Sequence, residues 1–249
     1  HESEMTEFLI KMLQIPSVTG QEGDIQSFMA KTLAENGMVV DVFEPSVEEL
    51  RKHPAFVEPQ SSYEGRPDVV GVLRGAGGGR SLLLNGHIDV IQEGAAENWT
   101  HGPWSGDVED GKIYGRGASD MKSGAAAMTM ALRALQQSGI RLRGDVMDEE
   151  LTGNGTLACV LRGYHADAGI CCETSSMCVQ PASIGRIWFE IRVKGKSADI
   201  QKRYEGVNAI ELGYLIQQAV AAFERTRTSS ISHPLYPDML SSIPCMVGS

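Results

Sequence analysis

Four clusters of imidazole and carboxylate groups along this 249-residue chain are suited to metal-dependent chemistry. The first contains His87 and Asp89, which follow the apolar run Leu82–Leu84. Side chains two residues apart leave a strand on the same face, so one can bind a metal ion while the other orients the imidazole ring. Taken alone, such a pair is more often a hydrogen-bonded histidine at the end of a strand.

The second cluster is the glycine-rich stretch from Asp110 to Gly124, in which Asp120 comes just before an expected helix. The positive end of a helix favours a carboxylate, and a carboxylate at this place can bridge two cations. The alternative is an ordinary N-cap of the helix by Asp120 or Ser123.

The third cluster is the run Asp148, Glu149 and Glu150, and the fourth is Glu173. Successive carboxylates repel one another unless they are solvated or neutralised by cations. A metal site accommodates them if one glutamate binds the metal and its neighbour acts as general base on a water molecule; a solvated acidic turn is the alternative. Glu173 directly follows the apolar Ile170–Cys172, where a carboxylate is costly unless it is paired or metal-bound.

In this order the four clusters resemble the site of the M20 metallopeptidase family, which includes acetylornithine deacetylase, succinyl-diaminopimelate desuccinylase and carboxypeptidase G. The resemblance covers most of the chain and is most specific between Asp110 and Gly124. The other residues that match are Ile15-Pro16-Ser17, Glu22, Gly86 to Val90, Trp99, Pro103-Trp104, Glu149-Glu150, Gly195 to Ala198 and Gly206 to Ile210.

The resemblance implies a site for two zinc ions, with cobalt or manganese as possible substitutes. His87 and Glu173 would bind the first ion, and Glu150 would bind the second. Asp120 would bridge the two ions.

The resemblance also implies two roles beside the metal ligands: Glu149 would be the general base, and Asp89 would orient His87. The implied reaction is hydrolysis of the amide bond of an N-acylated amino acid or small peptide by metal-activated water. The first alternative is an impaired or truncated family member that binds metal or dimerises without turnover. The second is a scaffold that takes up no zinc.

Three departures from the family pattern bear on activity. The family's second zinc ion takes a histidine from the C-terminal part of the catalytic domain, whereas the last histidine here is His233, in a lid-like segment. The lid motif Gly-Lys-Ser-Ala-His ends here in Asp199, whose carboxylate would repel a developing oxyanion. Too few residues separate Gly144 from Asp148 for the family's apolar strand, so we expect a central strand to be lost. A degenerate gene product, or part of a longer chain whose catalytic domain continues past Ser249, accounts for these departures.

Hydrophobic periodicity indicates an α/β layer architecture, and the resemblance implies the mixed sheet of a zinc exopeptidase. We expect a catalytic domain at residues 1–180 and a smaller α+β lid or dimerisation domain at residues 181–249. In the first domain we expect helices at Met5–Leu13, Glu22–Glu35 and Ser123–Gln137, strands at Met38–Phe43, Val69–Leu73 and Ser81–Asn85, and an irregular surface excursion at 44–67. In the second we expect a strand at Arg186–Val193 and a helix at Val207–Glu224.

The composition of the chain limits the classes of binding partner that we expect. A net charge of -10 disfavours nucleic acid, and no apolar run approaches the length of a membrane span, so we expect a cytoplasmic protein that acts on a small N-acyl amino acid or peptide. The cysteines include no C-x2-C pair, which argues against a structural zinc knot, and we expect Cys171 and Cys172 to be buried in a strand. The resemblance implies a homodimer through the lid, although the helix face of Ile210, Tyr214 and Leu215 could instead pack on its own sheet.

Overall fold

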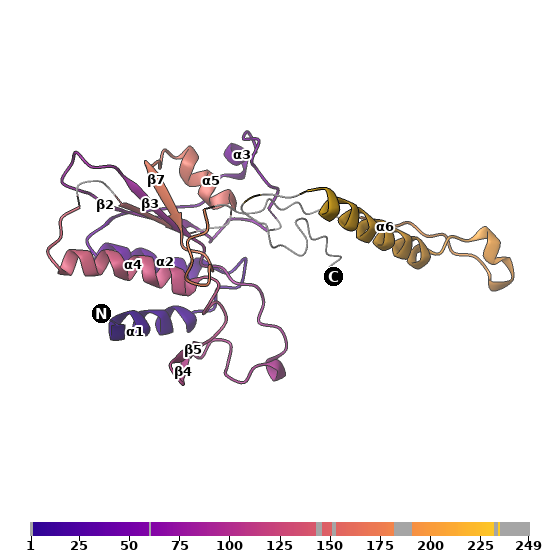
Figure 1. Cartoon of the computed structure of the whole chain (residues 1–249), viewed down its shortest axis with the longest axis horizontal. Helices are drawn as coiled ribbons and strands as arrows, with labels where there is room; N and C mark the ends of the chain where they lie inside the picture. Colours follow the sequence, from indigo (N-terminus) through magenta and orange to yellow (C-terminus); the bar gives the residue numbers. More distant parts are fainter. Residues whose placement is uncertain are drawn as a thin grey trace. The chain divides into compact units, whose positions relative to one another are not determined.

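The computed structural model describes residues 2–59, 61–142, 146–150, 153–181, 191–231 and 234, and of residues 146–150 it describes the backbone. The chain divides into two compact units, His1–Cys178 and Val179–Ser249, which Figure 1 shows from indigo to orange and from orange to yellow. Among the helices of the described ranges, none combines the length and the apolar character that crossing a bilayer requires.

A five-stranded mixed sheet in the order β1-β2-β6-β3-β7 lies at the centre of the first unit (Figure 1). The strands β6, β3 and β7 run parallel, whereas β2 is antiparallel to both β1 and β6. Because parallel strands end at the same edge of a sheet, the loops that follow β3 and β7 emerge side by side. The strand bounds are β1 Val39–Phe43, β2 Asp68–Leu73, β3 Leu82–Gly86, β6 Val146–Glu150 and β7 Ala168–Cys171.

Helices cover both faces of the sheet, because the apolar side chains of β2 point alternately to one face and to the other and are buried on both. Val69 belongs to the main apolar core, which contains buried residues of α1, α2 and α4. Val70 and Val72 face the other way, toward Cys159 of α5, because successive strand side chains point to opposite faces. Figure 1 shows α1, α2 and α4 on one side and α3 and α5 on the other. The helix bounds are α1 Glu2–Leu13, α2 Gly23–Glu35, α3 Val47–Leu50, α4 Lys122–Gln137 and α5 Gly153–Leu161.

A short hairpin precedes the loop that leads into α4. Strands β4 (Asp107–Glu109) and β5 (Lys112–Tyr114) pair antiparallel, and Asp110 and Gly111 between them both have positive φ. That backbone is the one that two-residue hairpin turns need, which explains the Asp-Gly sequence. A 3-10 turn, η1, covers Ala96–Asn98.

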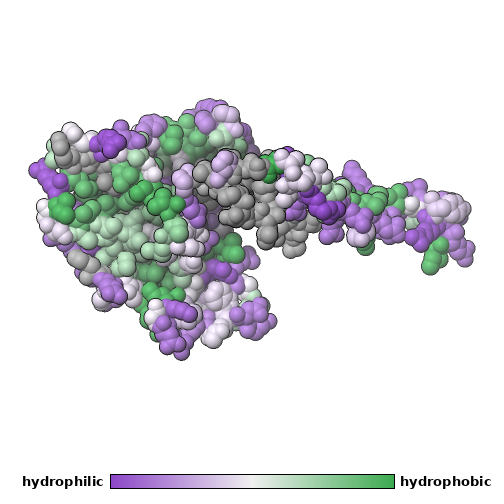
Figure 2. Space-filling model, in the orientation of Figure 1, coloured by the Kyte–Doolittle hydropathy of each residue, from purple (hydrophilic) through white to green (hydrophobic). Residues whose placement is uncertain are grey.

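The second unit is built around one long helix, α6 (Ala209–Ser230), preceded by the 3-10 segment η2 (Ile200–Glu205). Asn208 caps α6 by accepting hydrogen bonds from the backbone N–H groups of residues 210 and 211. None of the α6 residues is buried, and Ile210, Tyr214 and Leu215 are largely exposed. Most of the strand against which this helix face could pack, residues 186–190, lies outside the described ranges, so the dimer contact and the packing on its own sheet both stay predictions. Figure 2 shows apolar and polar residues interspersed along this unit.

Two sequence expectations about strands are wrong. The central strand is not lost, because Val146–Glu150 themselves form β6 between β2 and β3. The acidic residues thereby become part of the strand instead of following it. Cys171 is exposed and Cys172 only half-buried, because β7 is the outermost strand of the described sheet and all four of its residues are exposed.

Two further expectations need correction. The stretch 44–67 is not simply a surface excursion, since it contains α3 and buries Leu50, Tyr63 and Arg66. Of the strand expected at Arg186–Val193, residues 186–190 lie outside the described ranges and residues 191–193 form no strand. The other expected helices and strands are present, with ends that differ by a few residues.

Candidate metal centre

His87 lies directly after β3, at the carboxyl edge of the sheet. Its neighbour Gly86 allows Met121 to pack against the strand end, since a Cβ on Gly86 would lie 2.5 Å from the Met121 Cε. The backbone N–H of His87 contacts the Met121 Sδ at 3.2 Å. The backbone of His87 is therefore in contact with Met121, the buried residue between Asp120 and α4.

Glu173 reaches the same level by strand register. Asn85 pairs with Cys171 in the parallel β3–β7 ladder, and the N–H of Cys172 donates to the Asn85 carbonyl at 2.8 Å. Two residues after this pair, His87 and Glu173 are thus neighbours at the edge. This register could not be read from the sequence, because the two strands are more than eighty positions apart.

Asp120 comes from the loop before α4. Gly117 in this loop has a φ of 84° and lies so close to Val90 that a Cβ would meet the valine Cγ1 at 2.6 Å. The glycine pattern of this stretch thus serves a turn that passes tightly over the segment after β3. The turn carries Asp120 next to His87.

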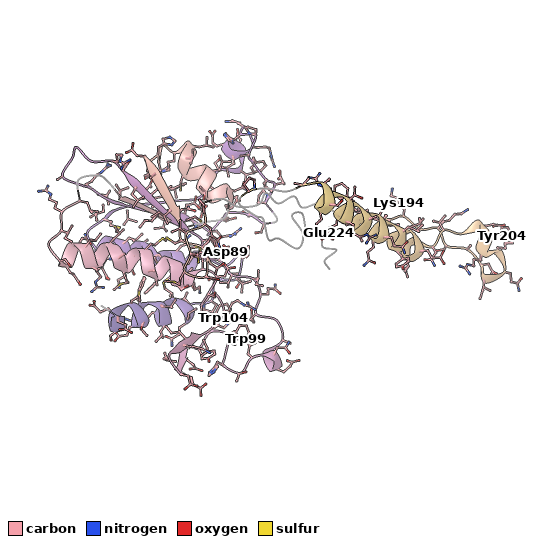
Figure 3. All side chains as sticks on the ribbon, in the orientation of Figure 1. Asp89, Trp99, Trp104, Lys194, Tyr204 and Glu224 are labelled. Atoms are coloured by element: carbon pink, nitrogen blue, oxygen red, sulfur yellow. The ribbon has the colours of Figure 1, made fainter. Side chains whose placement is uncertain are left out.

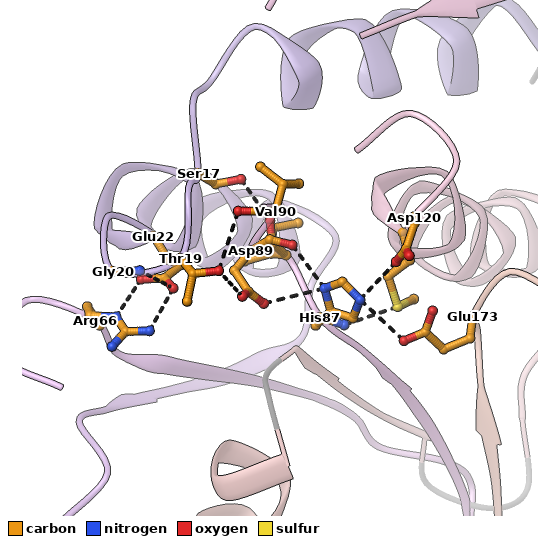
Figure 4. A network of polar contacts seen from close by, with 12 residues as sticks. Ser17, Thr19, Gly20, Glu22, Arg66, His87, Asp89, Val90, Asp120 and Glu173 are labelled. Atoms are coloured by element: carbon orange, nitrogen blue, oxygen red, sulfur yellow. Dashed lines mark hydrogen bonds and ion pairs between the residues drawn. The ribbon is translucent and has the colours of Figure 1, made fainter. Parts of the chain in front are cut away.

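These three side chains converge. The His87 Nε2 lies 3.1 Å from the Asp120 Oδ1 and 3.3 Å from the Glu173 Oε1 (Figure 4). One ligand atom of each residue lies within 4.8 Å of the other two. One imidazole nitrogen facing two carboxylates matches the mixed nitrogen and oxygen ligands that zinc accepts. The donor set therefore fits a divalent cation, which would offset the excess of negative charge.

Asp89 occupies the other side of the ring. Its backbone carbonyl and its Oδ1 lie 3.0 and 3.4 Å from the His87 Nδ1. Because Nδ1 faces acceptors, it carries a proton, and in the neutral imidazole the Nε2 lone pair is then free for a cation. Hydrogen bonding to Asp89, partly offset by burial, raises the pKa of His87 to about 9. Without a cation, the ring is accordingly protonated at neutral pH.

A chain of polar contacts behind Asp89 was not found from the sequence (Figure 4). The Thr19 hydroxyl donates to the Asp89 Oδ2 at 2.8 Å. The Glu22 Oε1 accepts from the N–H of Gly20 at 2.8 Å, and both Glu22 oxygens accept from the guanidinium of Arg66 at 2.5 and 2.7 Å. Glu22 matched the family pattern, but nothing in the sequence pointed to Thr19 or Arg66, whose partners are distant along the chain.

This chain of contacts keeps Asp89 ionised. Burial by itself would raise the pKa of Asp89, but hydrogen bonds from His87 and Thr19 and the charge of Arg66 lower it below its usual value. The pair Glu22–Arg66 is almost fully buried, so it fixes the loop that bears Thr19. A buried carboxylate with this many donors is suited to holding His87 in one orientation.

The tryptophans of the family pattern lie against two cations that flank Asp120. The guanidinium of Arg116 lies 4.9 Å from the centre of the Trp99 ring, and the Nζ of Lys122 lies 5.6 Å from that of Trp104. Figure 3 labels both tryptophans and Asp89 within the first unit. Stacking of this kind fixes the loop on either side of the carboxylate.

A cleft of about 420 Å³ opens beside His87 and Asp120. Its walls include Thr19, His87, Ile91, Arg116 and Asp120. A cleft of this size is in the range of small-molecule sites. The cleft thus has room for a small molecule beside the side chains of His87 and Asp120.

Glu149 and Glu150 are placed only by their backbones. Glu150 pairs with Gly86 and Glu149 with Asn85 in the parallel β3–β6 ladder. Glu150 thus lies level with Gly86, one position before His87. The structure does not describe their side chains, so their predicted roles stay predictions.

The two other departures from the family pattern concern Asp199 and His233, and the structure describes the first of these residues. Asp199 is the N-cap of η2, where its side chain accepts a hydrogen bond from the N–H of Gln201 at 2.9 Å. A histidine at position 199 would remove the carboxylate that accepts this hydrogen bond, so the cap of η2 explains why aspartate is suited to this position. His233 lies outside the described residues.

The chain matches known proteins both as a family and as single relatives. The sequence model of the peptidase family M20/M25/M40 matches residues 83–236, more than half of the chain. The N-formyl-4-amino-5-aminomethyl-2-methylpyrimidine deformylase of Bacillus subtilis is 36% identical over 185 residues, covering 71% of this chain and 39% of that protein. The succinyl-diaminopimelate desuccinylase of Methylorubrum extorquens is 41% identical over 124 residues, covering 49% and 28%. The chain thus spans less than half the length of these relatives.

Solved structures share the fold. A tripeptidase from Staphylococcus aureus superposes with a TM-score of 0.56 at 21% identity, covering 92% of this chain and 57% of that one. An M20 family metallo-carboxypeptidase from Sulfolobus solfataricus superposes with a TM-score of 0.53 at 20% identity, covering 68% and 37%. At these identities the likeness concerns the mixed α/β architecture.

Proposed function

Since the chain belongs to the peptidase family M20/M25/M40, we propose that it is a metal-dependent hydrolase that cleaves the amide bond of a small N-acylated substrate. The names of two relatives, a deformylase and a desuccinylase, both describe removal of an acyl group. An N-acylated amino acid or small peptide is the substrate class that we propose. The convergence of His87, Asp120 and Glu173 is the observation that carries this proposal.

In this proposal the three converging side chains hold one divalent cation. The preferred ion is zinc, and cobalt or manganese can replace it. When bound, the ion acts as a Lewis acid on the amide carbonyl and lowers the pKa of water toward neutrality. His87 binds through Nε2, because Asp89 occupies Nδ1. Asp120 and Glu173 supply negative charge from separate elements, so the site forms only in the folded chain.

The remaining roles follow from family membership and are proposals as well. Glu149 is the candidate general base, which takes a proton from water and passes it to the leaving amine. Glu150 would hold a second zinc ion, which it would share with Asp120. The second unit, with α6, is the candidate lid and dimer contact. A cytoplasmic location stays a prediction.

A second candidate function is metal binding without turnover. The observation that favours it is the backbone register of β6, in which Glu150 lies one position short of the level of His87 and Glu173. The N-cap role of Asp199, where the family has a histidine, favours it as well. A member of this kind would bind zinc and leave the substrate intact.

Zinc titration by calorimetry, combined with an assay of amine release from N-formyl, N-acetyl and N-succinyl amino acids, separates the candidates. We expect zinc binding that is lost in His87→Ala and retained in His165→Ala, an exposed histidine outside the site. Zinc binding with amine release supports the hydrolase, and zinc binding without release supports the second candidate. A folded chain that takes up no zinc contradicts both.

A further inference from the structure

The third residue of α4 is a glycine in a helix otherwise rich in alanine, methionine and leucine. Glycine destabilises a helix relative to alanine, so its presence needs a reason. A Cβ on Gly124 would overlap the carbonyl oxygen of Cys172 and would lie 3.0 Å from its carbonyl carbon. No side chain fits in that space. The first turn of α4 thus touches the backbone of the residue that precedes Glu173.

The same turn is held on another side by Lys122, whose side chain is fully buried. Its Nζ donates to the carbonyls of Met12 and Ile15, each at 2.9 Å. These carbonyls lie at the end of α1, where the partial negative charge of the helix terminus favours a cation. The lysine therefore ties the start of α4 to the end of α1.

We propose that the first turn of α4 is a clamp for the metal centre, and that Gly124 is the positioning residue that sets the distance between Asp120 and Glu173. Asp120 lies two residues before Lys122, and Glu173 directly follows Cys172, so each carboxylate is next to a point of contact. This inference rests on the proposed function, because it concerns the same site. A methyl group at residue 124 would push the first turn of α4 away from the backbone of Cys172. Asp120 and Glu173 would then lie too far apart to hold one cation together.

Gly124→Ala tests this clamp, with Gly213→Ala as the matched control. Gly213 lies inside α6, where an added Cβ would meet no atom within 4 Å, so alanine there leaves the first unit unchanged. We expect Gly124→Ala to bind zinc about 10- to 100-fold more weakly, as for changes beside metal ligands. With cobalt as the probe, its visible absorption spectrum should change, which reports a lost ligand. Gly213→Ala should match the wild type in both measurements.

Rescue distinguishes positioning from general damage. Asp120→Glu lengthens the side chain by one methylene, so it should weaken zinc binding in the wild type and strengthen it in the Gly124→Ala background. A merely structural role of Gly124 predicts that the two changes weaken binding together. That result, or wild-type zinc affinity in Gly124→Ala, overturns the inference.

Lys122→Met provides the test if Gly124→Ala does not fold. Methionine keeps the apolar length but donates no hydrogen bond to the α1 carbonyls, so we expect a folded chain with weaker zinc binding. Unchanged zinc affinity in a folded Lys122→Met chain overturns the inference while the proposed function stands. If the folded wild type itself binds no zinc, both are overturned.

Discussion

His87 faces carboxylates through both ring nitrogens, and the two sides differ in exposure. The side chain of Asp89 is 14% exposed, whereas those of Asp120 and Glu173 are 66% and 43% exposed. On the buried side, the hydrogen bond from the Thr19 hydroxyl holds the Asp89 carboxylate in place. The exposed side is open to the cleft. A cation from solution can therefore replace the proton on Nε2 without disturbing the hydrogen bonds at Nδ1.

Replacing Glu173 with glutamine should weaken zinc binding at least about tenfold, because it removes one charged ligand and keeps the shape. Glu109→Gln is the matched control, since Glu109 also faces a histidine, with its Oε2 3.2 Å from the Nε2 of His101. Calorimetric titration of both variants checks this. Equal zinc affinity in the two variants would show that Glu173 is not a ligand.

Replacing Thr19 with valine removes the hydroxyl that donates to Asp89 and keeps the side-chain shape. We expect zinc binding to weaken about tenfold, as for other partners of metal-bound histidines, and stability to fall by about 1 kcal/mol. Thr19→Ser keeps the donor and should retain most of the zinc affinity. If valine and serine bind zinc equally well, the hydroxyl does not orient the site.

At the scale of elements, periodic segments were predictable and their pairing was not. The helix Lys122–Gln137 and the strand Asp68–Leu73 show their period within a single window of sequence. By contrast, the placement of Val146–Glu150 between β2 and β3 depends on hydrogen bonds to strands far along the chain. Acidic residues have a low strand propensity, so the tertiary pairing overrides the local preference.

The candidate site was predictable to the same extent. His87, Asp120 and Glu173 were singled out because each stands at the end of an apolar run or next to a helix start, and their roles as ligands came from the resemblance to the family. The contact of Thr19 with Asp89 spans seventy positions and has no local signature. The exposure of Cys171 was missed, because an apolar run cannot tell a central strand from one at the edge of the sheet.

A cluster on the other face joins β1 to the segment after α5. The Asp41 carboxylate accepts from the Nε of Arg162 and from the Tyr164 hydroxyl, each at 2.6 Å. The hydrogen bond from Arg162 lowers the pKa of Asp41 against the effect of burial. Burial and the bond to Asp41 raise the pKa of Tyr164 to about 12.

The raised pKa of Tyr164 predicts how stability responds to alkali. The pKa of Tyr164 is about 12 in the folded state and about 10 in the unfolded state, so the folded state holds the phenolic proton more tightly. The contribution of Tyr164 is therefore complete below about pH 10 and is lost as the pH rises toward 12. Urea unfolding between pH 9 and about pH 11 should show a fall in the free energy of unfolding that is smaller in Tyr164→Phe. Tyr214→Phe, at an exposed helix position, should keep the wild-type dependence; equal slopes in all three chains would contradict the assignment.

At the scale of the whole molecule, the metal centre belongs to one compact unit. The three converging residues His87, Asp120 and Glu173 lie within His1–Cys178, as do the residues behind them, Thr19, Glu22 and Arg66. The apolar core formed by α1, α2 and α4 lies in the same unit. The elements that position the three ligands and the core on which they pack thus belong to the first unit.

A fragment of residues 1–178 should therefore fold and bind zinc with the affinity of the full chain. A ligand that binds only the folded state stabilises it by about 2.7 kcal/mol when its free concentration is 100 times its Kd. Thermal unfolding followed by circular dichroism should show a zinc-dependent rise in Tm for the fragment and for the full chain alike. The same fragment with His87→Ala should show no rise. If the fragment is folded but zinc leaves its Tm unchanged while it raises that of the full chain, residues beyond Cys178 contribute a ligand that the three converging side chains do not replace.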